Sequence, residues 1–366
     1  MRYLQIQIKG YRSLADITLD LHPLTVMIGP NGCGKTSLLE IFQLLKDAAQ
    51  NRLEEAITAR GGLGLLLTHI RDTPFQLEIA LQMIVDSTIS AEPVFYRFVL
   101  RPAVITYAIA LEQFEWPRTP QDPQPYFFEF KETTGRELRL TIADLSVSLS
   151  EILVKTLSLS GLDVDPRAPV RLPQALTPAT HPGRNGENLF AALYNMRESR
   201  TSRPFYERVE ETLRLAFPDF DRLELQVVGA GQITLAWHEK NLTVPLYPNQ
   251  LSEGTLRFLW LTTILLSPEP PPLILIDEPE ISLHPELLQI MAALLRDASA
   301  RTQLLVATHS SDLIRWLRPD EVVVIDKQEG KPTFTWANDP ALNLEEWLKE
   351  YTLADLWFMG NLGGRP

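Results

Sequence analysis

The stretch from Leu24 to about Asn51 constrains the fold of this chain more than any other segment. It begins with the apolar run Leu24 to Ile28, which is typical of a strand buried on both faces of a sheet. A loop with three glycines follows at 29–36, and apolar residues then recur at helical spacing: Leu38, Leu39, Ile41, Phe42, Leu44, Leu45 and Ala48. The sequence therefore predicts a strand, a tight loop and a helix from about Thr36 to Asn51, the core of an α/β protein.

The chemistry of the loop points to phosphate. It reads Gly29, Pro30, Asn31, Gly32, Cys33, Gly34, Lys35 and Thr36, with Ser37 next, and fits G-x-x-x-x-G-K-[ST] without a mismatch. Glycines allow backbone N–H groups to point at phosphate oxygens, and the N-terminus of the following helix adds partial positive charge. We expect ATP to bind along 29–37, with Lys35 on the β- and γ-phosphates and the Thr36 hydroxyl on Mg²⁺. The alternative is a glycine-rich turn between a strand and a helix that binds nothing. Cys33, at a variable position of the pattern, is expected to be a small filler and not a nucleophile.

A second apolar run ends in two acidic residues. Leu273 to Ile276 read as a buried parallel strand, and Asp277 and Glu278 follow directly. Carboxylates at this position suit a Mg–ATP site: Asp277 would support the metal ion and Glu278 would activate a water molecule as a general base. An acidic turn after a core strand is the alternative interpretation.

Two further segments place polar residues at the ends of predicted elements. Residues 251–255, LSEGT, precede a helical run, so Ser252 and Gly254 form either a second phosphate-binding helix end or an ordinary N-cap. Residues 304–308 read as a strand that ends at His309, and a histidine at the carboxyl edge of a parallel sheet can contact a ligand there. Each signal alone also fits a structural role.

Together these segments resemble the ABC-type ATPases. The loop at 29–36, the signature at 251–255, the carboxylates at 273–278, a D-loop at 279–285 and the switch histidine at 309 follow in the family's order. Ser252 precedes Asp277 by 25 residues, and Glu278 precedes His309 by 31. The opening IKGYRSLADITLDLHPLTVMIGPNGCGKTSLLE and the segment DEPEISLHP look like the SMC/RecF/OLD-like branch. The resemblance covers about 1–50 and 185–366.

This resemblance implies catalytic roles for the loop and the strand ends. Lys35 and Thr36 would bind phosphate and magnesium, and Asp277 would support the metal ion. Glu278 would be the catalytic base, and His309 would sense the γ-phosphate.

The resemblance also implies a partner. Ser252 and Gly254 would contact ATP bound to a second subunit, so a head-to-tail homodimer around two ATP molecules is expected. Arg12, in GYRS, matches a basic position that approaches the nucleotide. The glutamine of the family's Q-loop stays open among Gln76, Gln82 and Gln113.

Pattern and proline content divide the remaining chain. Residues 1–73 are expected to form the N-terminal lobe of the ATPase core, and 74–165, with several short β-like segments, an antiparallel β subdomain. Five prolines lie between 166 and 182, so 166–221 is expected to form a linker and a helical subdomain inserted into the core. Residues 222–366, where strands and helices alternate, would form the C-terminal lobe with a mostly parallel sheet.

Composition excludes several classes of protein. A single cysteine, Cys33, rules out an intramolecular disulfide and a cysteine-ligated zinc site. The net charge of −12 gives no bulk attraction to nucleic acid, and the arginines between 197 and 214 alternate with glutamates, as on a solvated helix face. The longest apolar stretch, Phe258 to Leu266, is about half of a membrane span. We expect a cytoplasmic protein with no membrane partner.

These observations favour an ATP-hydrolysing enzyme that acts in DNA repair, DNA maintenance or anti-phage defence, with a separate effector protein. DNA itself enters only by analogy with the family. Two alternatives remain: the energising subunit of a membrane transporter, and a nucleotide switch or scaffold that does not hydrolyse ATP. The β insert and His284 argue against the transporter, and the intact Glu278 argues against the switch.

Overall fold

The computed structural model describes residues 2–70, 73–84, 92–103, 107–116, 126–133, 153–328, 331–344 and 347–362. Its centre is a mostly parallel sheet with the strand order β15-β14-β3-β13-β12-β8. The strands are β3 (Leu24–Ile28), β8 (Leu157–Leu159), β12 (Leu273–Asp277), β13 (Gln303–Thr308), β14 (Val322–Gln328) and β15 (Lys331–Trp336). Only the pairing of β14 with β15 is antiparallel within these described strands. The predicted α/β class with a mostly parallel sheet is confirmed.

Alternating residues of this central sheet enter two different cores. In β3, Leu24, Val26 and Ile28 belong to one core and Met27 to the other. Helix α8 (Pro285–Ser299) contacts β3 and β13 from the first side, and α1 (Lys35–Ala49) contacts β12 and β13 from the second. Because both faces are covered, every residue of β3 and β13 is buried, which explains why these strands read as unbroken apolar runs.

Helix α1 ends slightly before the predicted position. It spans Lys35–Ala49, whereas the periodicity continues to about Asn51. Asn51 has a φ of 59°, in the left-handed region, and this conformation stops the helical ladder. Two shorter helices follow, α2 (Leu53–Ala59) and α3 (Leu63–Leu66).

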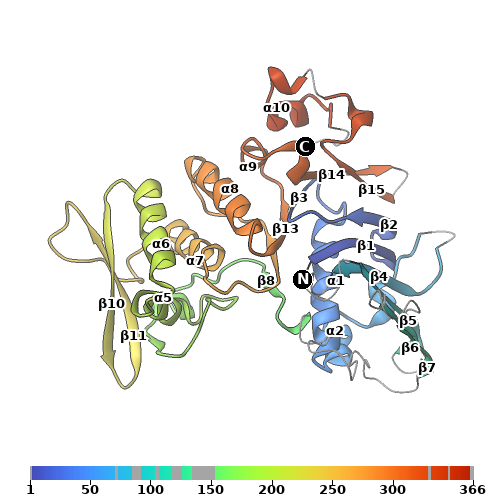
Figure 1. Ribbon diagram of the computed structural model, residues 1–366, viewed down its shortest axis with the longest axis horizontal. Helices are drawn as coiled ribbons and strands as arrows, with labels where there is room; N and C mark the ends of the chain where they lie inside the picture. Colours follow the sequence, from blue (N-terminus) through green and yellow to red (C-terminus); the bar gives the residue numbers. More distant parts are fainter. Residues whose placement is uncertain are drawn as a thin grey trace.

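An antiparallel sheet covers the side of α1 opposite the central sheet (Figure 1). Its strand order is β2-β1-β4-β5-β6-β7. The strands are β1 (Arg2–Tyr11), β2 (Leu14–Asp20), β4 (Leu77–Ile84), β5 (Val94–Pro102), β6 (Tyr107–Trp116) and β7 (Tyr126–Thr133). Part of the N-terminal lobe and part of the 74–165 segment therefore share one sheet.

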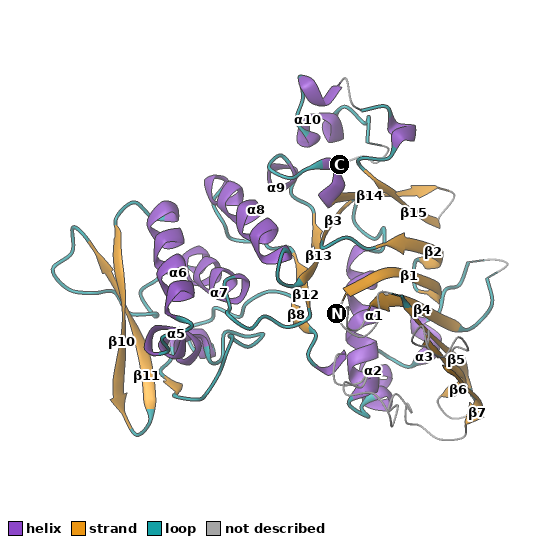
Figure 2. Cartoon of the chain, viewed as in Figure 1, coloured by secondary structure: helices purple, strands orange, loops and turns teal. Residues whose placement is uncertain are grey.

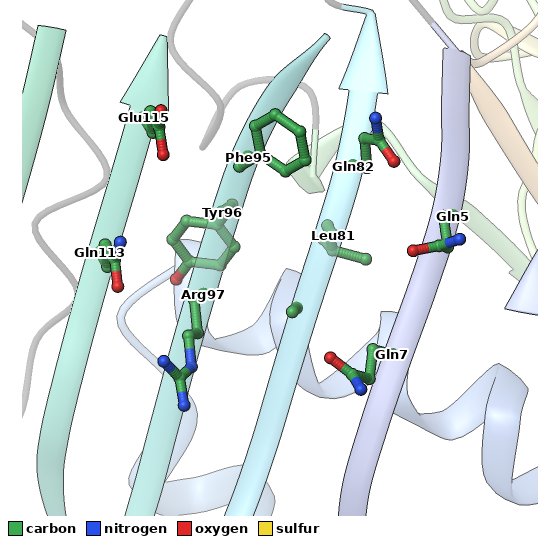
Figure 3. A pocket seen from close by; sticks show the side chains of 10 residues that line it. Gln5, Gln7, Leu81, Gln82, Phe95, Tyr96, Arg97, Gln113 and Glu115 are labelled. Atoms are coloured by element: carbon green, nitrogen blue, oxygen red, sulfur yellow. The ribbon is translucent and has the colours of Figure 1, made fainter. Parts of the chain in front are cut away.

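The outer face of this sheet carries a hollow of about 340 Å³ that is lined by both polar and apolar side chains. Figure 3 shows side chains from neighbouring strands around it, including Gln7, Gln82, Arg97 and Gln113. Ala80 is paired with Gln7 on one side and Arg97 on the other, so a small side chain lies between two long ones and leaves the hollow open.

A third sheet lies among the middle helices at the far end of the molecule (Figure 2). It has the order β10-β11-β9, with β9 (Gln174–Ala175), β10 (Phe220–Gly229) and β11 (Gln232–Glu239). Helices α5 (Leu189–Glu198) and α6 (Arg203–Ala216) pack against it, and α7 (Glu253–Leu265) contacts both helices. Strands β10 and β11 thus lie with the helical segment, and β8, from the 74–165 segment, lies in the central sheet.

The remaining elements are short. They are α9 (Ser311–Ile314), α10 (Leu353–Phe358) and the 3-10 turns Pro169–Arg171, Pro319–Glu321, Pro340–Leu342 and Trp347–Lys349. Among the described residues, no helix has the length and apolarity needed to cross a membrane.

Candidate nucleotide site

The register of the central sheet brings three strand ends together. Strand β13 lies between β3 and β12, with Thr308 opposite Ile28 and Ala307 opposite Asp277. The glycine-rich loop, His309 and Glu278 therefore leave the sheet side by side at its carboxyl edge. Ligands of open α/β sheets bind at this edge.

Steric constraints explain why two positions of the loop, Gly29 and Gly34, are occupied by glycine. Gly34 has a φ of 110°, which an L side chain rarely adopts, and a Cβ there would lie 2.6 Å from Leu14 Cδ2. A Cβ at Gly29 would lie 2.4 Å from the carbonyl oxygen of Ile325 in β14. The loop thus depends on glycine both for its own path and for its close approach to the neighbouring strand.

Lys35 lies at the centre of the loop and is only 4% exposed. Its ammonium donates to the carbonyl oxygens of Gly29 at 2.5 Å and Pro30 at 3.0 Å, and lies 3.4 Å from His309 Nδ1. Burial lowers the pKa of Lys35, while Cys33, Asp277 and Glu278 oppose this shift. Cys33 itself is buried, as expected of a filler.

Thr36 and Asp277 form the oxygen pair predicted for magnesium. The Thr36 hydroxyl donates to Asp277 Oδ2 at 3.3 Å. Burial raises the pKa of Asp277, the neighbouring charge of Glu278 adds to this, and the bond from Thr36 opposes it. A hydroxyl and one carboxylate are ligands that Mg²⁺ accepts when phosphates and water complete its shell. The described residues include no group of three or more His, Cys, Asp or Glu that could hold a metal without such help.

Glu278 and His309 face each other beside this pair. His309 Nε2 lies 3.8 Å from Glu278 Oε1, and both side chains are more than a third exposed. Glu278 has a φ of 52°, in the left-handed region where a non-glycine residue is uncommon. Burial lowers the pKa of His309, the charge of Lys35 lowers it further, and Glu278 acts in the opposite direction. The neutral imidazole is therefore favoured next to the lysine.

The signature residues lie elsewhere in the same chain. Ser252 caps α7, and its hydroxyl accepts a bond from Thr255 N at 3.1 Å, so the structural role weighed for it is present. Next to it, Ser282 donates to Glu253 at 2.6 Å, and a Cβ at Gly254 would lie 2.4 Å from the carbonyl oxygen of Ser282. Across the described ranges, no hydrogen bond or ion pair joins 251–255 to 29–36.

Arg12 does not point freely into the site. Its guanidinium forms an ion pair of 2.6 Å with Glu40 of α1, and its φ is 48°. The next residues, Ser13 and Leu14, are the ones that approach Gly34. The turn at Arg12–Leu14 therefore lies beside the glycine-rich loop, but the Arg12 side chain is paired with Glu40 of α1.

The three candidate glutamines differ in position. Gln82 and Gln113 line the outer hollow of the antiparallel sheet, on the face opposite α1 (Figure 3). Gln76 lies against Gly10, one residue before the Tyr11–Leu14 turn, and its side chain accepts a bond from Arg101. Of these three glutamines, Gln76 lies nearest in the chain's path to the turn that contacts Gly34 of the glycine-rich loop.

Sequence reasoning assigned no role to Glu280. Its carboxylate Oε1 accepts bonds from the Thr308 hydroxyl at 2.6 Å and from His309 N at 3.0 Å. A third acidic residue directly after Asp277-Glu278-Pro279, together with a threonine at the end of a buried strand, was the available signal.

The strand–loop–helix segment at 24–49 and the order of the central sheet define a P-loop fold. A profile of the family described as "AAA domain, putative AbiEii toxin, Type IV TA system" matches residues 24–315, and the chain belongs to this family.

One curated protein and several solved structures are also similar to parts or all of this chain. A segment of 41 residues is 49% identical to part of an OLD nuclease of Thermus scotoductus. This segment makes up 11% of this chain and only 8% of the nuclease. The Smc head domain of Pyrococcus furiosus, solved with the C-terminal domain of ScpA, is similar over 96% of this chain and 100% of that one, with a TM-score of 0.57 and 11% identity. The Smc head domain of Pyrococcus yayanosii is similar over 95% of this chain and 100% of that one, with a TM-score of 0.56 and 10% identity. At these identities the structures establish a shared fold alone.

Proposed function

We propose that this protein hydrolyses ATP at the carboxyl edge of its central sheet. The observation that carries the proposal is the convergence of Lys35, Thr36, Asp277, Glu278 and His309, which come from both ends of the chain. Each residue type suits one need of phosphoryl transfer: a cation for the phosphates, oxygen ligands, a base for water and a group near the γ-phosphate.

Each of these residues would have a separate role in ATP binding and hydrolysis. Lys35 and the loop N–H groups hold the phosphates, and Thr36 with Asp277 would hold Mg²⁺, which supplies charge neutralisation when bound. Glu278 accepts a proton from the attacking water, since its carboxylate is exposed to solvent and lies next to the loop. His309, whose neutral form is favoured by burial and by the charge of Lys35, would donate a hydrogen bond to the γ-phosphate.

The second part of the proposal is a nucleotide-driven homodimer. Ser252 and Gly254 begin α7, and the partial positive charge of that helix end suits a phosphate. Since no hydrogen bond or ion pair among the described residues links this helix end to the loop of its own chain, the ATP it would contact is that of a second copy. Head-to-tail packing of two chains satisfies both sites at once.

The biological setting is proposed from the relatives. The short match to an OLD nuclease and the toxin-related description of the family favour a role in anti-phage defence or DNA maintenance, with the effector on a separate protein. DNA contact through α6 is disfavoured, because its arginines form ion pairs: Arg203 with Glu207, Arg208 with Asp297 and Arg214 with Glu210. A transporter subunit and a non-hydrolysing switch remain the competing functions.

Phosphate release with Mg–ATP tests the catalytic proposal directly. Lys35→Ala is expected to lose nucleotide binding, because the central cation is removed from the loop. Glu278→Gln is expected to retain binding and lose turnover by about 100-fold or more, as for other general bases. Binding is measured with a fluorescent ATP analogue, so the two defects are separated. Equal hydrolysis rates in both variants and the wild type would refute the catalytic assignment.

A further inference from the structure

Glu280 lies on the turn after β12 and reaches the end of the neighbouring strand β13. Its Oε1 accepts the Thr308 hydroxyl at 2.6 Å and His309 N at 3.0 Å. The Thr308 hydroxyl oxygen in turn accepts Ser310 N at 2.9 Å. Residues 308–310 are thus all tied to one carboxylate oxygen of Glu280. Thr308 and His309 bond to it directly, and Ser310 is linked to it through the Thr308 hydroxyl.

The backbone of His309 needs this acceptor because the sheet ends there. The last pair with β3 is Thr308 and Ile28, and the last pair with β12 is Ala307 and Asp277. Ser310 already caps α9 through its side chain, with Leu313 N at 3.1 Å. The N–H of His309 therefore lies between a strand and a helix, and Glu280 supplies the acceptor that neither element offers.

This backbone anchor fixes the point from which the imidazole of His309 extends. With His309 N fixed by Glu280, the ring lies 3.4 Å from Lys35 Nζ on one side and 3.8 Å from Glu278 Oε1 on the other. Neither contact is short enough to hold an otherwise mobile ring. The anchoring bonds of 2.6 and 3.0 Å are the stronger constraint.

The second carboxylate oxygen shows that the side chain is held in place for these bonds. Glu280 Oε2 is buried and has no hydrogen-bond partner among the described residues. Leaving a buried acceptor unsatisfied costs free energy. Burial raises the pKa of this carboxyl, against the bonds from Thr308 and His309.

We propose that Glu280 is a positioning residue that orients His309 for ATP hydrolysis by anchoring the end of β13 to the turn after the catalytic carboxylates. The inference rests on the proposed ATPase and adds a residue to it. Glu280 contacts no substrate in this scheme and acts only through His309.

Steady-state kinetics give the first test. Glu280→Ala is expected to lower kcat by about 10- to 100-fold, by analogy with the loss seen when the hydrogen-bond partner of a metal-ligating histidine is removed, and to change KM by less than about threefold. Glu280→Gln keeps an acceptor at Oε1 and should restore most of the lost rate. In a His309→Ala background, Glu280→Ala should have little further effect, since both changes act through one group.

Thr308 provides a milder pair of variants in case Glu280→Ala does not fold. Thr308→Val removes the hydroxyl that links Glu280 to Ser310, and it should lower kcat in the same direction. Thr308→Ser keeps the hydroxyl and is the matched control. Thermal unfolding of all variants separates loss of folded protein from loss of rate.

A spectroscopic readout keeps the inference separate from the proposed function. The chain has six histidines, so the ring signals of His309 can be assigned in NMR spectra by their loss in His309→Ala. They should shift in Glu280→Ala and return in Glu280→Gln, without any need for turnover. If the wild type has no ATPase activity, the proposed function is refuted, but the NMR comparison still tests whether Glu280 positions His309. Unchanged His309 signals in Glu280→Ala, or an equal kcat loss with and without His309, would overturn the positioning role.

Discussion

Glu278 combines a strained backbone with an exposed carboxylate. Its φ of 52° turns the chain sharply at the end of β12, while its N–H still donates to Ala307 O at 2.8 Å. The cost of such a conformation, about 1–3 kcal/mol, is typical of functional sites. The turn directs the side chain towards His309 instead of along the sheet, so the strain serves the geometry of the site.

The pKa of His309 predicts a pH dependence of stability. Because burial and Lys35 lower this pKa in the folded protein, the unfolded chain binds the proton more tightly. The folded state therefore has its full relative stability above the unfolded pKa of about 6.5, and loses it as the pH falls through the folded pKa. Urea unfolding without nucleotide should show a smaller acid-side loss in His309→Gln than in the wild type. Parallel curves between pH 8 and 5 would contradict the shift.

At the scale of elements, α7 and the turn at 279–284 are packed as one unit. Ser282 donates to Glu253 at 2.6 Å, and Arg257 pairs with the same Glu253 oxygen at 3.3 Å. The turn also carries Glu280, which anchors β13. The helix end proposed to meet the partner's ATP is therefore connected through one short turn to His309 of its own chain.

Gly254→Ala tests this packing. The new Cβ would lie 2.4 Å from the Ser282 carbonyl oxygen, which is backbone and cannot rotate away. We expect a loss of about 1–3 kcal/mol in the free energy of unfolding, the usual cost of overpacking, measured by urea denaturation. Gly64→Ala in α3 is the matched control, because nothing lies within 4 Å of its Cβ and alanine favours a helix. If both variants unfold alike, the close contact is not a constraint.

At the scale of the whole molecule, two segments far apart in sequence build one site. Thr36 and Asp277, which are joined by a hydrogen bond, are 241 residues apart, and most of the antiparallel sheet and the middle helices lie in that interval. The central sheet takes β3 from the first part of the chain and β12, β13 and β14 from the last. A site assembled in this way forms only when the whole core has folded.

Mass measurement by light scattering after size-exclusion chromatography tests the dimer. Glu278→Gln with saturating Mg–ATP is expected to elute at about twice the 41.5 kDa of one chain, because ATP stays bound between the subunits. Lys35→Ala should stay monomeric, and Ser252→Arg should bind ATP without dimerising. A monomeric Glu278→Gln at saturating Mg–ATP would exclude the proposed assembly.

ATPase rates with and without DNA test the proposed setting. Single- or double-stranded DNA is expected to stimulate hydrolysis at low salt and less so at about 0.2 M, since phosphate contacts weaken with ionic strength. A polyanion such as heparin is the control for charge alone. Rates that DNA does not change would leave a protein partner as the activator.

The sequence by itself determined the loop, the two carboxylates and the strand that ends at His309, because local pattern dictates local structure: the apolar runs and glycines have one good conformation each. It also predicted the α/β class and the mostly parallel sheet. It did not identify Glu280, since a hydrogen bond between a turn and a strand 28 residues later has no periodic signature.

Only the tertiary structure decided how these pieces meet. The strand order placed β13 between β3 and β12, and the register set His309 between Lys35 and Glu278. It also joined β1 and β2 to β4–β7 in one sheet and paired Arg12 with Glu40. Strand order and side-chain partners depend on long-range burial and pairing, which no local stretch of residues encodes.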